Sequence, residues 1–97
     1  MNKKVNDLIK IILLIDNNSK DSINLELPKT QKLDKLSALI CLMYNYDLKT
    51  IIITHESISL DDYKFKNLTL EKLALKNKNN VKEVELCLED KEKFNCI

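Results

Sequence analysis

The most restrictive feature of this 97-residue sequence is that it contains no glycine. Glycine is the residue that adopts left-handed backbone conformations at little cost, so tight turns in this chain must be made by asparagine, aspartate or other residues. The phosphate-binding loops of nucleotide-binding proteins also require glycine, because the backbone itself approaches the phosphates. The sequence therefore excludes the P-loop and dinucleotide-binding classes.

The charged residues argue against nucleic acid and anionic membrane as partners. All sixteen basic residues are lysine, and fifteen acids balance them to a formal net charge of +1. Without arginine, the bidentate recognition of guanine or phosphate is absent. Because neither half of the chain forms a basic field, we expect no nucleic-acid binding and no membrane binding.

The three cysteines are Cys41, Cys87 and Cys96, and the only histidine is His55. The odd number and wide spacing of the cysteines favour neither a disulfide framework nor a zinc site. A zinc site would need more ligands, in a closer pattern, than these three cysteines and one histidine supply. Reduced thiols are typical of a cytoplasmic or nuclear protein. We therefore expect no metal, no cofactor and a cytoplasmic or nuclear location.

The first fifteen residues include the longest apolar run, and we interpret it as a strand. Lys10 interrupts the run, and Asp16 follows it where a signal peptide would carry a small-residue cleavage site. The run is also far shorter than the roughly 20 residues that span a membrane. A signal peptide and a membrane helix are therefore not expected.

The first half of the chain has the apolar pattern of a hairpin. Apolar residues recur at every second position in Leu8–Ile15 and again in Ile23–Leu27, which predicts two strands. Asp16–Ser22 is polar, and we expect Asn17 or Asn18 to take the left-handed conformation in this turn.

A helix is predicted next. Pro28 ends the second strand, Thr30 is the predicted N-cap and Asn45 the left-handed C-terminal cap. Ser37, Cys41 and Asp34 are expected away from the centre of the apolar stripe, and Cys41 is expected to be a small packing residue, as is Cys87 on the last strand. Spacings of three and four residues define that stripe as Leu33, Leu36, Ile40 and Met43.

The sequence of the second half of the chain predicts three further strands and one short helical segment. Thr50–His55 is a third strand, Ser57–Tyr63 a short fourth strand with a turn, and Leu68–Leu75 a compact turn and helix. Val84, Leu86 and Leu88 then alternate with polar residues in the last strand. We expect one domain over residues 1–97, in which 1–7 and 89–97 are loosely attached ends.

This order of elements, with its inward apolar positions, resembles the ubiquitin-like family. Between Ile11 and Leu60 the spacing of these positions matches the family without a gap, and Leu70–Leu75 is similar to its later leucine-rich segment. The matching positions are Ile11, Leu13, Ile15, Ile23, Leu25, Leu27, Leu33, Leu36, Ile40, Ile53 and Leu60. The resemblance implies an α+β fold, a ubiquitin-like β-grasp with a mixed sheet of four to five strands packed on one helix.

The sequence departs from the conjugated members of this family at its end. Those members finish in Gly-Gly, whereas this chain finishes in Phe94-Asn95-Cys96-Ile97. The resemblance therefore implies a non-conjugating member that binds other proteins. Asn18, Thr54, Glu85 and Cys87 replace the apolar patch that receptors read on ubiquitin. A modifier that needs unseen processing is the alternative.

A weaker likeness within the family is to elongin B. Leu60-Asp61-Asp62, the leucine-rich connection, Val84-x-Leu86 and an acidic tail with Phe94 are similar to that adaptor subunit. This likeness implies a protein partner in a complex of the ubiquitin-ligase type. A bacterial ubiquitin-like secretion-accessory protein is a further alternative, which the source organism would decide.

Catalytic motifs are not expected. His55 shares the parity of inward residues, which favours a histidine at the core edge. Ser57 and Ser59 lie near it without the elbow motif of serine hydrolases, and Asp61-Asp62 fits solvated turn residues. We therefore expect a protein that is not an enzyme.

The predicted interaction site is the face of the sheet that lies away from the helix. In a β-grasp the first and last strands are neighbours, and the third strand flanks the last. Side chains of one parity on these three strands then share the outer face, and a contiguous apolar strip there is typical of a partner site. The predicted site residues are Ile12, Leu14, Ile52, Thr54 and Cys87.

Overall fold

The computed structural model describes residues 7–16, 18–77 and 81–91. Asn17, and the tail residues Phe94 and Cys96, lie outside the described residues. Within the described ranges, no helix is long and apolar enough to cross a membrane.

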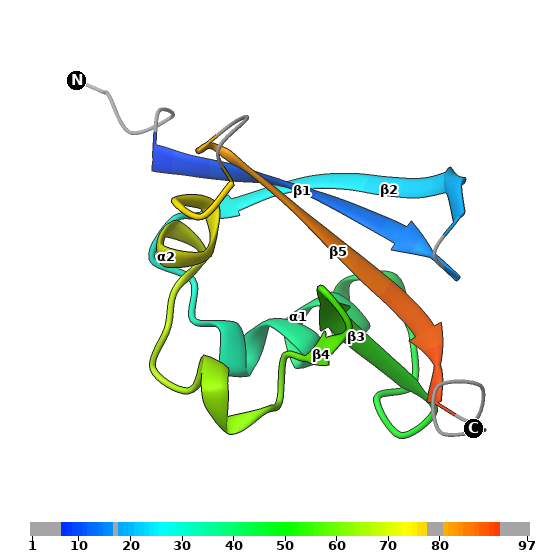
Figure 1. Ribbon diagram of the computed structural model, residues 1–97. Helices are drawn as coiled ribbons and strands as arrows, with labels where there is room; N and C mark the ends of the chain where they lie inside the picture. Colours follow the sequence, from blue (N-terminus) through cyan, green and yellow to red (C-terminus); the bar gives the residue numbers. More distant parts are fainter. Residues whose placement is uncertain (1–6, 17, 78–80, 92–97) are drawn as a thin grey trace.

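A five-stranded sheet forms one layer of the molecule, and the helices lie on one of its faces (Figure 1). The strands run in the order β2-β1-β5-β3-β4, with β1 parallel to β5 and the other pairs antiparallel. The sheet is therefore mixed. The strands are β1 (Leu8–Ile15), β2 (Asn18–Pro28), β3 (Ile51–His55), β4 (Ile58–Ser59) and β5 (Glu83–Asp90).

The β1–β2 hairpin keeps a regular register through most of its length. Ile11 faces Leu25 and Leu13 faces Ile23, and the register shifts only at Leu14 and Ile15. The left-handed residue of the hairpin is Asp16, with φ of 54°. The predicted alternatives were Asn17, which is not described, and Asn18, which belongs to β2.

The chain enters its main helix differently from the prediction. A 3-10 turn, η2 (Leu33–Lys35), comes first, and α1 (Leu36–Tyr44) then begins with Lys35 at its N-cap. Thr30 lies in a turn before η2, so its prediction as the N-cap is wrong. The predicted left-handed cap at the other end is confirmed, because Asn45 has φ of 61° and its N–H bonds to the Cys41 carbonyl.

The core lies between the sheet and the helices, and its composition corrects the predicted helix stripe. Leu36 and Ile40 are buried as expected, but Met43 is 48% exposed while Ser37 and Cys41 are buried. At about 100° per residue the buried residues of α1, Leu36, Ser37, Ile40 and Cys41, span about 140°, and Met43 lies about 90° from their centre, at the border of the buried face. The inward face of the sheet is supplied by Ile9, Ile11, Leu13, Leu25, Ile53, Val84, Leu86 and Leu88.

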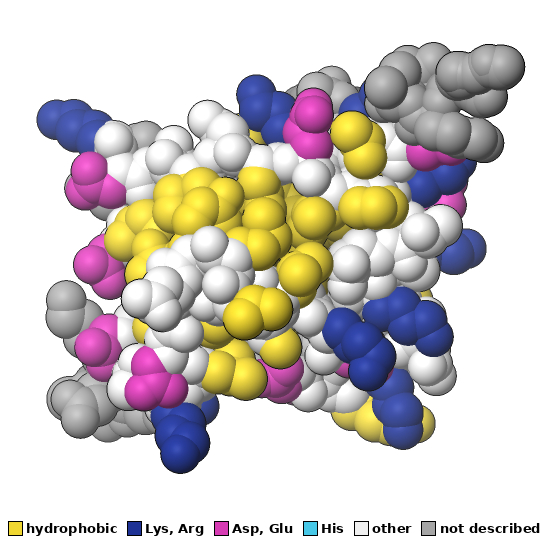
Figure 2. Space-filling model, turned by 180° about the vertical axis from the view of Figure 1, so that it is seen from behind, with side chains coloured by type: hydrophobic (Ala, Val, Ile, Leu, Met, Phe, Trp, Pro, Cys, Tyr) yellow, Lys and Arg dark blue, Asp and Glu magenta, His cyan; other side chains and the backbone are white. Residues whose placement is uncertain are grey.

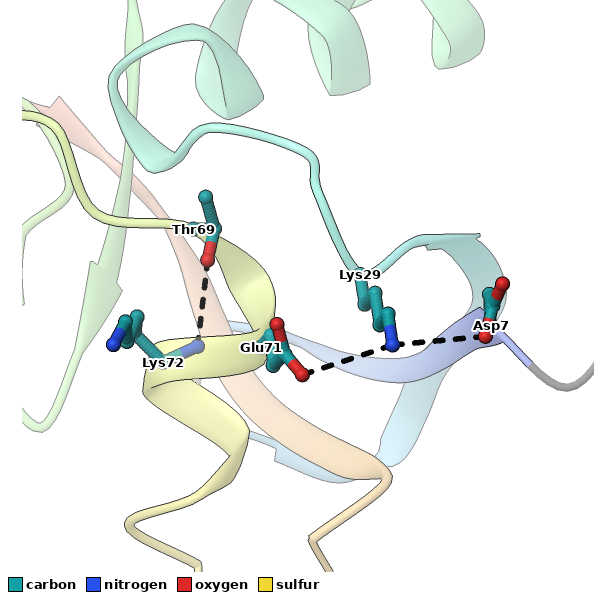
Figure 3. Close-up of polar contacts among 5 residues, drawn as sticks. All are labelled: Asp7, Lys29, Thr69, Glu71 and Lys72. Atoms are coloured by element: carbon teal, nitrogen blue, oxygen red, sulfur yellow. Dashed lines mark hydrogen bonds and ion pairs between the residues drawn. The ribbon is translucent and has the colours of Figure 1, made fainter.

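The connection back to β5 contains η3 (Tyr63–Phe65) and the short helix α2 (Leu70–Ala74). Figure 3 shows how α2 is attached to the start of the sheet. The Lys29 Nζ lies 3.6 Å from a carboxylate oxygen of Asp7 and 3.8 Å from one of Glu71. The hydroxyl of Thr69 accepts a hydrogen bond from the N–H of Lys72 and caps the helix.

At both ends of the sheet, residues that were predicted to be loosely attached form backbone hydrogen bonds. The N–H of Lys29 bonds to the carbonyl of Asp7, which extends the β1–β2 ladder toward the start of the chain. At the other end β5 continues to Asp90, and the N–H of Lys91 bonds to the Thr50 carbonyl. Residues 89–91 are therefore held in the sheet, although the predicted loose tail begins at 89.

Candidate protein-interaction site

The five predicted site residues lie on the outer face of the sheet, away from α1. Ile11 and Leu13 are core residues, so Ile12 and Leu14 point to the opposite face of β1. The registers place Leu14 beside Cys87 and Cys87 beside Thr54 in one row across β1, β5 and β3.

The exposure of these residues differs from the prediction. Leu14 is only 8% exposed and Thr54 only 2%, so the expectation that they form contact surface is wrong. Both flank Cys87 in the central row, where neighbouring strands about 4.8 Å apart cover them on both sides. The partly exposed members are Ile12, Ile52 and Cys87. Cys87 lies between the buried pair, whereas Ile12 is paired with Glu85 and Ile52 with Glu89, in the rows on either side.

A groove of about 610 Å³ runs along β5 on this face. It brings together Ile12, Thr54 and Cys87, whereas Leu14 and Ile52 are not among the residues that line it. The groove continues past the β3–β4 turn toward Lys76, at the end of α2. Most of the residues that line the groove are polar or charged, and Ile12, Leu73 and Val84 are its aliphatic members.

The acidic residues of β5 dominate the charge of this site. Glu85 and Glu89 line the groove on either side of Cys87, and neither forms an ion pair among the described residues. Glu83 lies 3.9 Å from Lys10. Burial raises the pKa of the Cys87 thiol, and the negative charges of Glu89 and Glu85 raise it further. A cationic group of a partner protein would reduce the electrostatic repulsion between these neighbouring carboxylates.

The turn between β3 and β4 forms one end of the groove. Glu56 and Ser57 have φ of 51° and 72°, and both residues line the groove. Positive φ at both central residues of a two-residue hairpin is the geometry of a type I′ turn. Sequence reasoning missed these two residues, because the usual signal for this turn is Asn-Gly or Asp-Gly and this chain contains no glycine.

His55 ends β3 next to this turn and is partly buried. Burial lowers its pKa, and the cations of Lys76 and Lys64 lower it further, while Glu56 acts in the opposite direction. The prediction of a histidine at the core edge is therefore confirmed.

The other polar residues considered for catalysis stabilise turns. The Ser59 hydroxyl accepts a hydrogen bond from the N–H of Asp61 at 3.1 Å, and the Asp62 carboxylate accepts one from the N–H of Lys64 at 2.9 Å. In the part of the chain that the structure describes, no group of His, Cys, Asp and Glu residues has a spacing that could hold a metal ion.

The architecture and the solved structures together define the fold. The chain has a ubiquitin-like β-grasp fold, and the predicted fold class is confirmed. The ubiquitin of Caldiarchaeum subterraneum superposes with a TM-score of 0.60 and 18% identity, covering 87% of this chain and 94% of that protein. ATG8 of Trypanosoma brucei superposes with a TM-score of 0.64 and 9% identity, covering 90% and 76%.

A third similar structure is the ubiquitin-like domain of the Arabidopsis thaliana protein At2g32350, with a TM-score of 0.54 and 14% identity, covering 90% and 81%. No protein-family model and no curated protein sequence matches the chain. At these identities the likeness establishes the fold alone, so function must be argued from the surface.

Proposed function

We propose that this protein is a non-catalytic interaction module that binds a partner protein through the outer face of its sheet. The observation that supports this proposal is the apolar strip across β1, β5 and β3 on the face away from the core. Ile12 and Ile52 are partly exposed there without packing against the main core. Exposed apolar side chains that the core does not use, bordered by charged residues, are typical of partner sites.

The charges around the strip define the chemistry of the partner. Glu85 and Glu89 are four residues apart on one strand, which places them about 13 Å from each other. Glu56 and Glu83 add two more carboxylates to the groove, and Lys76 is the one lysine among its lining residues. A fitting partner has an apolar side chain between two lysine or arginine side chains at a similar separation. Such complementarity accelerates association and selects against acidic partners.

The proposed role is that of an adaptor subunit in the cytoplasm or nucleus, in a complex of the ubiquitin-ligase type. The alternative is a modifier that becomes attached to other proteins, which requires a diglycine, and these 97 residues contain no glycine. The two roles are separated by incubating the purified chain with a ubiquitin-activating enzyme and ATP. We expect no ATP-dependent thioester through Ile97, and a reducible adduct there would contradict the adaptor role.

The binding surface is tested with two aspartate substitutions, Ile12→Asp and Ile52→Asp, in one chain. Leu14 is unsuitable for this purpose because it is buried, and a buried charge would unfold the domain. The control is Tyr63→Asp, at a residue of η3 that is 82% exposed and does not line the groove. Each tagged chain is used to capture proteins from the native cell, and the bound proteins are quantified by mass spectrometry.

We expect the double variant to stay folded by circular dichroism and to lose at least one protein that the parent and the control retain. Equal capture by all three chains would contradict the proposal. The charge preference is tested separately with Glu85→Lys and Glu89→Lys, which should weaken capture of the same protein and should make its binding less sensitive to salt.

A further inference from the structure

A second unpartnered surface lies on the other side of the molecule, where β2 forms an edge of the sheet beside α1. Figure 2 shows hydrophobic side chains gathered in one continuous area over this region. Ile23 and Leu27 of β2 are partly buried against the core, as is Leu39 of α1. Met43 is 48% exposed. We refer to these four residues as the β2–α1 surface.

The composition of α1 is unusual for a helix at the surface. Its nine residues, Leu36–Tyr44, include no charged side chain. A surface helix normally has a polar outer face, whereas one that is apolar on most sides is usually covered by another element. Leu42 and Met43 are nevertheless exposed, so α1 has an apolar face that no described element covers.

The hydrogen-bonding pattern of β2 shows which backbone groups are open on its outer edge. The N–H of Lys29 bonds to the carbonyl of Asp7, so these two residues form a hydrogen-bonded pair. Because such pairs alternate in an antiparallel ladder, the odd-numbered residues of β2 bond to β1. Ser22, Asn24 and Glu26 then direct their N–H and carbonyl groups to the open edge, where no strand of the described chain lies.

Pro28 agrees with this assignment. It is an even-numbered residue at the end of β2, so the N–H that proline lacks would have been on the open edge. Proline is tolerated at such an edge position because no ladder hydrogen bond is lost. The open edge is therefore a regular segment from Ser22 to Leu27 that ends at a proline.

We propose that a second copy of this chain pairs with that edge, β2 against β2, in an antiparallel arrangement with Asn24 on the two-fold axis. In this register each Asn24 faces the other, and Ser22 faces Glu26 of the second copy. All three residues carry open N–H and carbonyl groups, so each facing pair forms two hydrogen bonds. Registers that place Pro28 or the bulge near Asn18 opposite these residues form fewer.

The side chains are also complementary in this register. On the helix side of the sheet, Ile23 faces Leu25 of the second copy, and directly opposed apolar residues stabilise paired strands. On the outer side no two carboxylates face each other, because Glu26 is opposite Ser22. The self-pairing thus satisfies the open backbone groups of β2, pairs Ile23 with Leu25 and avoids like-charge repulsion between Glu26 side chains.

The proposal is tested by sedimentation equilibrium of the full chain under reducing conditions, over concentrations that detect dissociation constants from about 1 µM to about 1 mM. The test variant is Asn24→Pro, which removes an open N–H without removing a bond to β1. The matched control is Asn24→Ala, which keeps the N–H and loses only the side chain. We expect the parent and Asn24→Ala to form dimers. The dimer dissociation constant of the proline variant should be higher by about tenfold or more.

Amide hydrogen exchange provides a readout that does not depend on the variants. In the parent, the N–H groups of Ser22, Asn24 and Glu26 should exchange more slowly as the concentration rises, whereas those of β4 should not change. A parent that stays monomeric over this range, a dimer unaffected by Asn24→Pro, or exchange at these three amides that is independent of concentration would each overturn the proposal. Asn24 is the cross-strand neighbour of Ile12, but the two proposals have separate readouts. Self-association is measured on the purified chain, whereas the proposed function is measured by capture of another protein, so either can fail without the other.

Discussion

His55 packs edge-on against Phe65, with their ring centroids 6.2 Å apart and their planes at 86°. His55 is the last residue of β3, and Phe65 is a buried residue at the end of η3. The contact joins the β3–β4 hairpin, which closes one end of the groove, to the core. It also places a titratable group where burial lowers its pKa.

This contact predicts that the free energy of unfolding depends on pH through His55. The histidine pKa is lowered in the folded state, so the unfolded chain binds the proton more readily. The contribution of neutral His55 is therefore complete above the unfolded pKa of about 6.5 and is lost as the pH falls through the lowered folded value.

Urea unfolding between about pH 7.5 and about pH 5 measures this effect. The control is His55→Gln, which cannot titrate in this range, so subtracting its profile removes the contribution of the carboxylates. We expect the parent to lose more stability than the variant as the pH falls. Parallel profiles for the two proteins would show that the His55 pKa is not lowered.

The β3–β4 turn predicts a stabilising substitution. Ser57 has φ of 72°, in the left-handed region that favours glycine. Ser57→Gly should raise the free energy of unfolding by about 1 kcal/mol, because glycine adopts the left-handed conformation without steric cost in the folded state. The greater conformational entropy of glycine in the unfolded chain offsets part of this gain. Ser22→Gly, in the regular part of β2, is the control and should lower it by about 0.5–1 kcal/mol. Destabilisation by both substitutions would mean that Ser57 is not left-handed.

The apolar periodicity was sufficient to predict the order of the elements. Leu8–Ile15 is a strand with the predicted bounds, and Asn45 caps the helix as expected. Thr30 was misplaced because the sequence contains no signal that separates a 3-10 turn from the first turn of an α-helix. Of the predicted helix stripe only Met43 was misplaced, since it is 48% exposed, whereas Cys41 is buried as expected of a small packing residue.

The outer face could be predicted by parity, but its exposure could not. Alternation places Leu14 and Thr54 on the outer side of their strands, which the structure confirms. How much of each side chain is covered depends on which residues occupy the neighbouring strands at the same level, and this is set by the register. The β2–α1 surface was missed because Leu39 was not considered, although the absence of charge in α1 was visible in the sequence.

The packing of the core predicts a clear difference between inward and outward residues. Leu36→Ala and Ile53→Ala should each lower the free energy of unfolding by about 2–5 kcal/mol, because both side chains are fully buried. Glu26→Ala, on the exposed side of β2, should change it by less than about 0.5 kcal/mol. Equal losses at the two kinds of site, measured by denaturant unfolding, would contradict the assigned faces.

The central row of the outer face predicts a thiol of low reactivity at Cys87. Burial raises its pKa, and the carboxylates of Glu89 and Glu85 on the same strand raise it further. Because the thiolate is the reactive form, alkylation of Cys87 at about pH 8 should be slower than that of an unperturbed cysteine. Mass spectrometry of the peptide that contains Cys87 follows this reaction without substituting the other cysteines.

Removing one of these negative charges should reverse part of the effect. Glu85→Gln and Glu89→Gln should each lower the pKa of Cys87 and increase its alkylation rate below that pKa, because the thiolate is no longer opposed by a neighbouring carboxylate. Glu26→Gln, on β2, is the matched control and should leave the rate unchanged. If all three variants react at the parent rate, the groove does not have the acidic character on which the proposed preference for a basic partner depends.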